Sequence, residues 1–125
     1  MRDRYLRPSD RPARFVLTER VRSLVEIRRL NLVDPEWPDE GPFDVIFCRN
    51  VLMYLEAGYR ESVARRMASR LVPGGLLILD PAEHLGRVGP LFSHRGAGVF
   101  TLRPTARIPI ESDGSAERLS NGKKP

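Results

Sequence analysis

Two polar side chains, Arg49 and Asn50, interrupt the most apolar stretch of the chain, FDVIFCRNVLMYL between Phe43 and Leu55. Burying a guanidinium or a carboxamide without a partner costs several kcal/mol on transfer scales. We therefore expect that some other group holds this pair, and the first question is which elements position it.

A strand, a helix and a second strand are predicted around the pair. Five of the six residues from Phe43 to Cys48 are apolar, as in a buried strand. Residues 56–71 carry apolar side chains at helical spacing, with their arginines mainly on the other face. Pro73-Gly74-Gly75 is expected to end this helix, and Leu76 to Leu79 to form a second buried strand. A strand–helix–strand unit predicts an α/β fold with an at least partly parallel sheet.

The polar pair falls where the first of these strands ends. In open α/β sheets, ligands bind at the carboxyl ends of parallel strands. Asn31 follows an expected strand from Leu24 to Leu30 and would lie at the same edge of the sheet. The pattern predicts a ligand site with two amide side chains and one cation. The alternative interpretation is ordinary capping of strand ends.

The flanking segments are predicted to be less regular. Residues 1–14 are expected to form an irregular basic segment, 15–104 the domain, and 105–125 a disordered tail. Trp37, in a proline-rich loop, is expected to cap the domain surface. Residues 15–24 are predicted as a strand or a helical turn, and residues 34–42 as a loop. Within residues 86–104, Val88 to Phe92 and Val99 to Leu102 are expected to form an antiparallel pair at a sheet edge.

The composition is that of a small globular domain. The 125 residues, 41% of them hydrophobic, suffice for one core. No apolar run approaches the roughly 20 residues of a membrane helix, so no membrane insertion is expected. The one cysteine, Cys48, excludes an internal disulfide, fits a reducing cytoplasm and is expected to be an inert core residue.

The net charge of +5 is an N-terminal feature. Residues 1–30 contain nine arginines and four acidic residues, whereas residues 31–125 contain 12 basic and 12 acidic residues. Such an excess is typical of a solvated segment, and it could also face an acidic protein surface or nucleic acid. No aromatic platform is interleaved with the arginines, so binding of single-stranded nucleic acid is not favoured.

The motifs around the polar pair resemble those of a known family. FDVIFCRNVLMYL, the upstream RRLNLVDPEWP and the downstream LVPGGLLIL and LFSHRGAGVFTL are similar to the chemotaxis-receptor methyltransferases of the CheR type. The resemblance runs from about Arg4 to Arg103. It implies a Rossmann-like sheet and S-adenosyl-L-methionine (SAM) as cofactor, with S-adenosyl-L-homocysteine as product. It also implies methyl transfer to glutamate side chains of receptors, which are acidic protein substrates.

The resemblance implies roles for individual residues. Cofactor contacts fall on Asn31, Leu32, Arg49 and Asn50, and Tyr54 matches the tyrosine beside the methyl-transfer centre. A glutamate acceptor is already ionised at neutral pH, so no general base is required. Tyr54 and Arg49 are therefore the expected catalytic residues, acting through positioning and electrostatics.

Other acidic and imidazole side chains are less clearly assigned. Glu83 matches the glutamate of a short SEN-like motif of the family, although Asp80-Pro81-Ala82 precede it here. His84 and His94 have no partner at metal-ligand or catalytic spacing, so we expect surface residues and no metal site.

The chain also departs from the family's pattern. No glycine-rich loop joins a strand to a helix near its start, and no ribose-binding acid follows a second strand. We therefore expect the C-terminal half of the sheet only, as a truncated or split portion. The strand near Leu24 to Leu30 would then form a hydrophobic edge, which self-association or a second chain would cover.

Three functions are compatible with these features. The first is a SAM-dependent methyltransferase of the CheR type that esterifies glutamates of chemoreceptor-like proteins. The second is a non-catalytic remnant that acts as a protein-binding module in chemotaxis-like signalling. The third is nucleic-acid binding through the basic segment, which would be strongly salt-dependent.

Overall fold

The structure is a computed structural model that describes residues 2–108. Two compact units adjoin in sequence between Asn31 and Leu32. Of the tail that was predicted to be disordered, residues 109–125 lie outside the described residues. Ala106 and Ile108, which precede them, pack against the hydrophobic core of the second unit.

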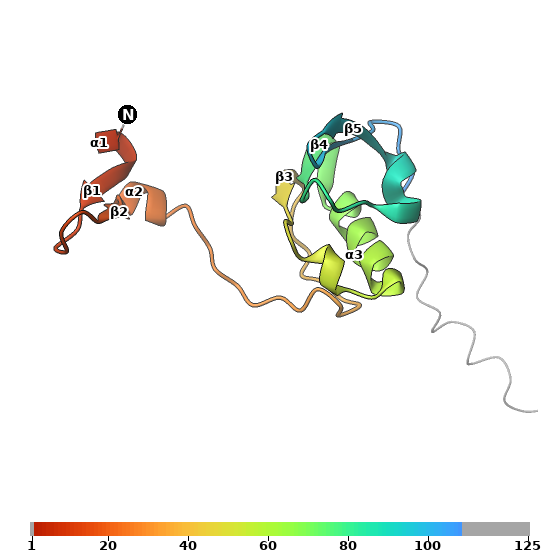
Figure 1. The fold of residues 1–125 in the computed structure, drawn as a ribbon, viewed down its shortest axis with the longest axis horizontal. Helices are drawn as coiled ribbons and strands as arrows, with labels where there is room; N and C mark the ends of the chain where they lie inside the picture. The colour runs from red at the N-terminus through yellow and green to blue at the C-terminus, as the bar shows by residue number, and fades with distance from the viewer. Residues whose placement is uncertain (1, 109–125) are drawn as a thin grey trace, which may run out of the picture. The chain divides into compact units, whose positions relative to one another are not determined.

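The N-terminal unit contains a two-stranded antiparallel sheet between two short helices (Figure 1). α1 (Arg2–Tyr5) leads into β1 (Leu6–Pro8), which pairs with β2 (Phe15–Leu17), and α2 (Glu19–Arg22) follows. None of the described side chains of this unit, residues 4–31, is buried. The unit is therefore held mainly by backbone hydrogen bonds rather than by an apolar core.

Two predictions for this part of the chain are wrong. The segment 1–14, expected to be irregular, contains α1 and β1, because pairing with β2 satisfies its backbone groups. The strand expected from Leu24 to Leu30 does not form, and the side chains of Leu24 and Ile27 are 83% and 92% exposed. A short apolar alternation favours a strand only where a neighbouring strand exists, and the described residues provide none here.

The second unit is built on a four-stranded mixed sheet in the order β3-β4-β6-β5. β3 (Phe43–Phe47) and β4 (Leu71–Ile78) are parallel and are joined by helix α3 (Ala57–Ser69). β6 (Val99–Leu102) pairs antiparallel with β4 on one side and with β5 (Phe92–Gly96) on the other. The predicted α/β fold, a partial Rossmann-like sheet with an antiparallel edge hairpin, is confirmed.

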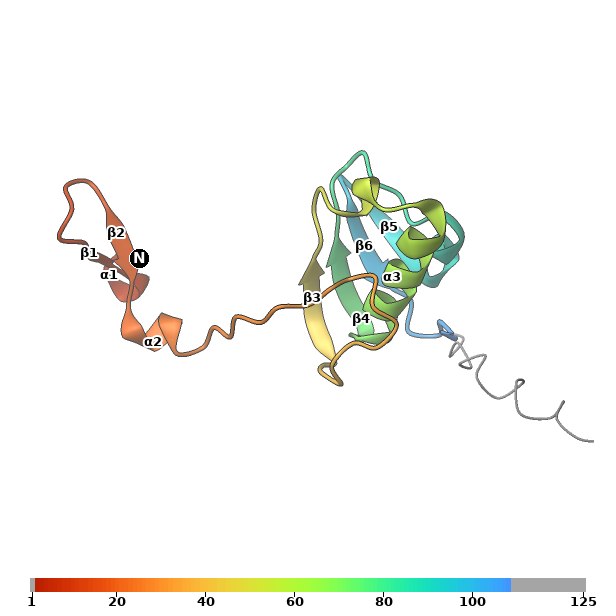
Figure 2. The ribbon, with the colours of Figure 1, turned by 90° about the horizontal axis from the view of Figure 1, so that it is seen from below.

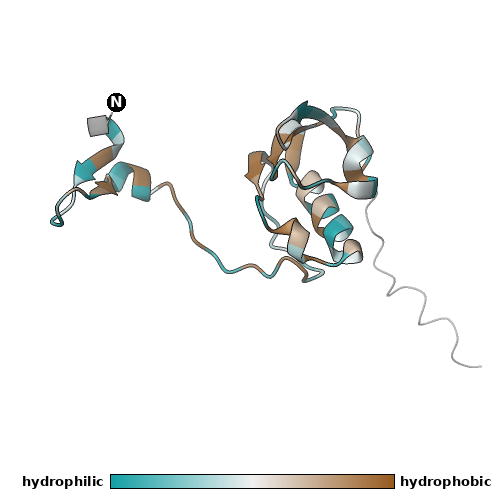
Figure 3. Cartoon of the chain, viewed as in Figure 1, coloured by the Kyte–Doolittle hydropathy of each residue, from teal (hydrophilic) through white to brown (hydrophobic). Residues whose placement is uncertain are grey.

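The core lies between α3 and one face of this sheet (Figure 2). Val63, Ala64, Met67 and Ala68 are the buried residues of α3, which confirms the predicted amphipathic helix. In Figure 3, β3 and β4 are hydrophobic along most of their length, whereas α3 alternates between hydrophobic and hydrophilic residues. Trp37 packs against the core, as expected of a cap.

The strand β3 forms where predicted, but it is an edge strand rather than a buried one. Phe43, Val45 and Phe47 are 42%, 40% and 72% exposed. Among the described residues β3 pairs only with β4. The exposed hydrophobic edge predicted for residues 24–30 is therefore found at β3 instead.

Two boundaries after β3 also differ from the predictions. Helix α3 ends at Ser69, and Pro73-Gly74-Gly75 lies inside β4, where the pairing with β3 shifts register. The chain enters β4 early because the N–H of Phe43 bonds to the carbonyl of Arg70 at 2.7 Å. The first strand of the antiparallel pair begins at Phe92, since Gly86–Leu91 forms the 3-10 helix η2.

Candidate functional site

The loop after β3 carries the polar pair at the carboxyl end of that strand. Cys48 is buried, whereas Arg49 and Asn50 are exposed. Asn50 has a φ of 58°, in the left-handed region that asparagine adopts more readily than most non-glycine residues. The chain then enters the short 3-10 helix η1 (Leu52–Tyr54).

Asp80 holds both polar side chains from the neighbouring strand. It lies just beyond β4, and its Oδ2 accepts hydrogen bonds from Arg49 Nη2 at 3.3 Å and from Asn50 Nδ2 at 3.2 Å. Its Oδ1 accepts from the backbone N–H of Ala82 at 3.0 Å. The Ala82 N–H, with further contributions from Asn50 and Arg49, keeps the pKa of Asp80 below its ordinary value. Asp80 is therefore an ionised partner of the pair at neutral pH.

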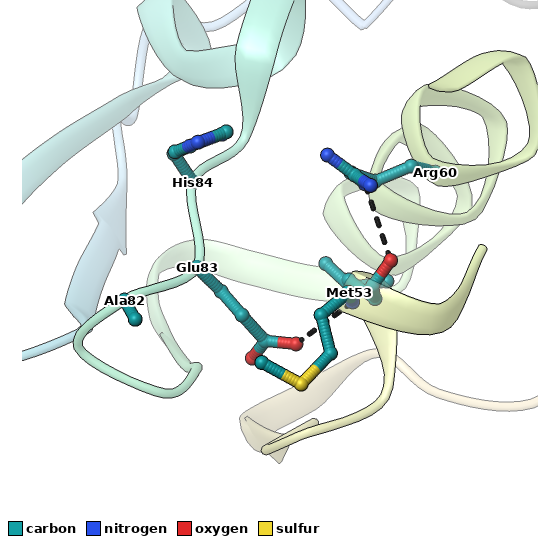
Figure 4. A pocket seen from close by; sticks show the side chains of 6 residues that line it. Met53, Arg60, Ala82, Glu83 and His84 are labelled. Carbon is teal, nitrogen blue, oxygen red and sulfur yellow. Dashed lines mark hydrogen bonds between the residues drawn. The ribbon is translucent and has the colours of Figure 1, made fainter. Parts of the chain in front are cut away.

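Glu83 holds the backbone of the same loop. Only 8% of this residue is exposed, and its carboxylate accepts three backbone hydrogen bonds. The donors are the N–H groups of Asn50 at 3.2 Å, Met53 at 3.2 Å and Asp80 at 2.9 Å. Figure 4 shows Glu83 reaching from the β4 side toward Met53. One carboxylate thus ties together the loops that follow two adjacent parallel strands.

Cys48, beneath this loop, is not an activated nucleophile. Burial raises the pKa of its thiol, and the negative charge of Glu83 raises it further. A thiol of raised pKa stays protonated at neutral pH, and the thiolate is the nucleophilic form. This agrees with the prediction of an inert core cysteine.

The structure brings together three of the predicted site residues. Arg49, Asn50 and Tyr54 lie on one loop, and Tyr54 is 81% exposed. Leu32 packs against the core instead. Asn31 is the last residue of the N-terminal unit, so the structure does not place it with the other four.

The backbone of Leu32 is fixed by two side chains. Its carbonyl oxygen accepts hydrogen bonds from Trp37 Nε1 at 3.2 Å and from Arg66 Nη1 at 2.9 Å. The Arg66 guanidinium also lies 5.6 Å from the centre of the Trp37 ring, at cation–π distance. This carbonyl therefore serves to fasten the loop to helix α3.

Two residues of the site were not identified from the sequence as partners of the polar pair. In the sequence, Asp80 stands out only as a departure from the family motif, and the motif assigns Glu83 no definite role. A signal was present, because Asp80 follows a strand parallel to β3, and the carboxyl ends of parallel strands meet at one edge. The rule that located Arg49 and Asn50 also applies to Asp80.

A pocket of about 170 Å³ lies beside η1 (Figure 4). Arg60, on α3, borders it, and its guanidinium donates hydrogen bonds to the carbonyls of Leu52 and Leu55, both at 3.1 Å. The six residues that line the pocket come from η1, α3 and the loop after β4: Leu52, Met53, Arg60, Ala82, Glu83 and His84.

Two further features are absent from the part of the chain that the structure describes. Within residues 2–108, no three His, Cys, Asp or Glu side chains are grouped so that they could hold a metal ion. No helix in the same range has the length and apolar character needed to cross a membrane.

Comparison with known proteins points in one direction. Residues 1–100 match the family described as CheR methyltransferase, SAM binding domain. A chemotaxis protein methyltransferase of Klebsiella aerogenes is 41% identical over 78 residues, which are 62% of this chain and 27% of that protein. Chemotaxis protein methyltransferase Cher2 of Pseudomonas putida is 42% identical over 82 residues, 66% of this chain and 29% of that protein.

A third relative covers more of the chain. Chemotaxis protein methyltransferase 2 of Pseudomonas aeruginosa is 34% identical over 94 residues, 75% of this chain and 33% of that protein. In these three alignments the chain spans a third or less of the relative's length.

Proposed function

Because this chain belongs to the CheR methyltransferase family, we propose that it forms part of a SAM-dependent site for protein methylation. The acceptors in this proposal are glutamate carboxylates of chemoreceptor-like proteins. The observation that carries it is the loop after β3, where Arg49, Asn50 and Tyr54 present exposed polar groups. Asp80 and Glu83, which follow β4, accept hydrogen bonds from that loop.

The residues of this loop fit one wall of a SAM site. Asn50 uses its Nδ2 to bond Asp80, and its amide oxygen makes no hydrogen bond within the described residues. That oxygen is free to accept from an amino group of the cofactor. Arg49 bonds Asp80 through one Nη atom, which leaves other N–H groups for a carboxylate. Asn31 and Leu32 remain proposed contacts on the basis of the family motif.

The proposed chemistry needs positioning rather than proton transfer. When bound, SAM would supply a methyl group activated by its positively charged sulfur. Arg49 would orient the acceptor carboxylate by charge-assisted hydrogen bonds, and the Tyr54 hydroxyl would donate a hydrogen bond to the reacting oxygen. No residue takes up a proton, because a glutamate acceptor is already ionised at neutral pH.

We propose that another polypeptide completes the sheet beside β3, either a second copy of the chain or a different chain. The support is the exposed edge of β3, whose apolar side chains include Phe47 at 72% exposure. The residues ahead of β3 contain no glycine-rich loop between a strand and a helix, so the loop after β3 would supply one wall of the SAM site only. A cytoplasmic location is proposed from the single buried thiol.

The same edge favours a second candidate function. A sheet with one open strand and half of a ligand crevice would also suit a non-catalytic protein-binding module in chemotaxis-like signalling. This candidate and the enzyme differ in whether the loop after β3 has to bind the cofactor.

Calorimetric titration with S-adenosyl-L-homocysteine tests the proposal. We expect Asn50→Gly to weaken binding about tenfold or more, because glycine keeps the positive φ of 58° but removes the amide. Ala97→Gly is the matched control, since Ala97 also has a positive φ, of 49°, and lies in the β5–β6 turn. The control should bind as the unmodified chain does.

Either of two results would contradict the proposal. Equal binding by Asn50→Gly would exclude a role for its amide. Absence of heat at millimolar ligand, for the chain alone and for any self-associated form, would favour the binding module.

A further inference from the structure

The pocket beside η1 is bordered by a guanidinium whose orientation is fixed. Arg60 donates from Nε to the carbonyl of Leu52 and from Nη2 to the carbonyl of Leu55. Within the described residues, its Nη1 makes no hydrogen bond and the side chain has no ion pair. Because two bonds already hold the planar group, binding a ligand through Nη1 would cost little further side-chain entropy.

An imidazole faces this guanidinium across the pocket. In Figure 4, the side chains of His84 and Arg60 point toward one another from the β4 loop and from α3. His84 is exposed and, among residues 2–108, has no hydrogen-bond or ionic partner. Its ring presents at least one N–H donor in either charge state. Two donors therefore face one pocket, which the Glu83 carboxylate also lines.

The acidic groups near the pocket are already engaged. The two oxygens of Glu83 accept the backbone N–H groups of Asn50, Met53 and Asp80, which offset its charge. Glu61, on the next position of α3, lies 3.9 Å from Arg87. Because no described acidic side chain forms an ion pair with Arg60, its positive charge is available to an anionic group in the pocket.

We propose that this pocket is a subsite for a carboxylate of the protein substrate, bound by Arg60 Nη1 and by the His84 ring. The proposal rests on the proposed function, and it gives the substrate a chemical feature: an acidic side chain besides the one that is methylated. A volume of about 170 Å³ admits a carboxylate-sized group and is too small for a nucleoside cofactor. The pocket also adjoins η1, whose last residue is Tyr54, so such a carboxylate would lie near the proposed reaction centre.

NMR titration of the labelled 125-residue chain tests this subsite without any cofactor. The probe is a capped tetraglutamate peptide at about 0.15 M salt, where long-range attraction to the basic chain is screened. We expect the probe to shift the His84 ring signals and the Arg60 Nε–H signal. A capped tetraglutamine peptide should leave both unchanged.

Three variants separate a specific subsite from general attraction. His84→Gln and Arg60→Lys should each raise the dissociation constant of the probe at least about fivefold, since each replaces a fixed planar donor by a more flexible one of different reach. Arg107→Gln removes an exposed charge outside the lining and should change the dissociation constant less than about twofold. Because Arg60 also bonds two carbonyls, the fold of Arg60→Lys is checked by its backbone spectrum, and His84→Gln serves as the independent variant.

Three results would overturn the subsite. The first is equal binding of the glutamine peptide. The second is equal weakening by Arg107→Gln and His84→Gln. The third is a shift of the His84 signals by inorganic phosphate as large as the shift by the glutamate probe. The test is independent of methyl transfer. If the chain binds S-adenosyl-L-homocysteine but not the glutamate probe, the subsite alone is rejected. If it binds the probe but not S-adenosyl-L-homocysteine, the cofactor site alone is rejected.

Discussion

Asp80 and Glu83 hold the loop after β3 in different ways. Asp80 bonds the side chains of Arg49 and Asn50 at the exposed surface. Glu83 is buried and bonds only backbone N–H groups, so it determines the path of the loop rather than its chemistry. Substitutions of these two carboxylates should therefore have separable effects.

We expect Glu83→Gln to destabilise the second unit. The carboxylate accepts three N–H bonds with two oxygens, whereas a glutamine offers one oxygen and turns an NH₂ group toward an N–H donor. The free energy of unfolding should fall by about 1.5–3 kcal/mol, the range for hydrogen bonds to a charged group. Urea denaturation measures it. The control is Glu36→Gln, because Glu36 is an exposed glutamate in the loop before β3. An equal loss of unfolding free energy in both variants would contradict the role assigned to Glu83.

The stability that Asp80 contributes should depend on pH. Its lowered pKa means that the folded state binds a proton less readily than the unfolded state does. The contribution is therefore present above the ordinary pKa of about 3.9 and is lost as the pH falls through the lowered value. The difference in unfolding free energy between the unmodified chain and Asp80→Asn should be constant above about pH 5 and should narrow below about pH 4.

Urea denaturation at a series of pH values measures this difference. Asp44→Asn, at an exposed aspartate of β3, supplies the background pH dependence of an aspartate substitution. A difference for Asp80→Asn that does not narrow under acid conditions would show that its partners do not favour the ionised form.

The β5–β6 hairpin is joined to the end of β4 by a close backbone contact. The N–H of Leu79 donates to the carbonyl of Gly98 at 2.9 Å. Gly98 has a φ of 77°, and a Cβ at this position would lie 2.4 Å from the carbonyl oxygen of Leu79. Only glycine allows the hairpin to approach the strand whose end carries Asp80.

This contact predicts a difference between two glycines of one turn. Gly96 also has a positive φ, of 94°, but a Cβ there would meet nothing within 4 Å. Both alanine substitutions incur backbone strain, and only Gly98→Ala adds a steric clash. We expect Gly98→Ala to lower the free energy of unfolding by at least about 1 kcal/mol more than Gly96→Ala does. Equal losses in thermal or urea denaturation would mean that the backbone relaxes around the new methyl group.

In the second unit as a whole, the sheet is covered unequally. By strand pairing, Val45 and Phe47 share a face with Leu76 and Ile78, whereas the neighbouring Leu77 is fully buried on the α3 side. β3 adds an unpaired edge to this partly exposed apolar face. Exposed hydrophobic edges of this kind promote pairing with another chain.

We therefore expect the purified chain to self-associate at micromolar concentration. Sedimentation equilibrium should give an average mass above that of one chain, and Phe47→Lys should lower it, because a charge at the edge opposes strand pairing. Ile27→Lys is the control, since Ile27 is 92% exposed but lies outside the four-stranded sheet. A monomer at all concentrations would leave sheet completion to a different chain, and an equal effect of Ile27→Lys would indicate non-specific association.

Much of the local structure could be predicted from the sequence. The period of the apolar residues located α3, and the mostly apolar run from Phe43 to Cys48 located β3, because both patterns reflect local backbone geometry. The order of these elements indicated a parallel strand–helix–strand unit, and the rule for strand ends placed Arg49 and Asn50 at one edge of the sheet. The motif around them indicated the family that the comparison then matched.

Other features required the tertiary structure, because they depend on which neighbours an element has. The run from Phe43 to Cys48 predicted a buried strand, and only the strand order showed that β3 lies at an edge. Leu24 to Leu30 alternates as a strand does, yet no described strand pairs with it. The role of Glu83 depended on bonds to residues about 30 positions away in the sequence. Periodicity records the preferences of a single element, whereas exposure, pairing and the satisfaction of a buried charge are properties of two elements in contact.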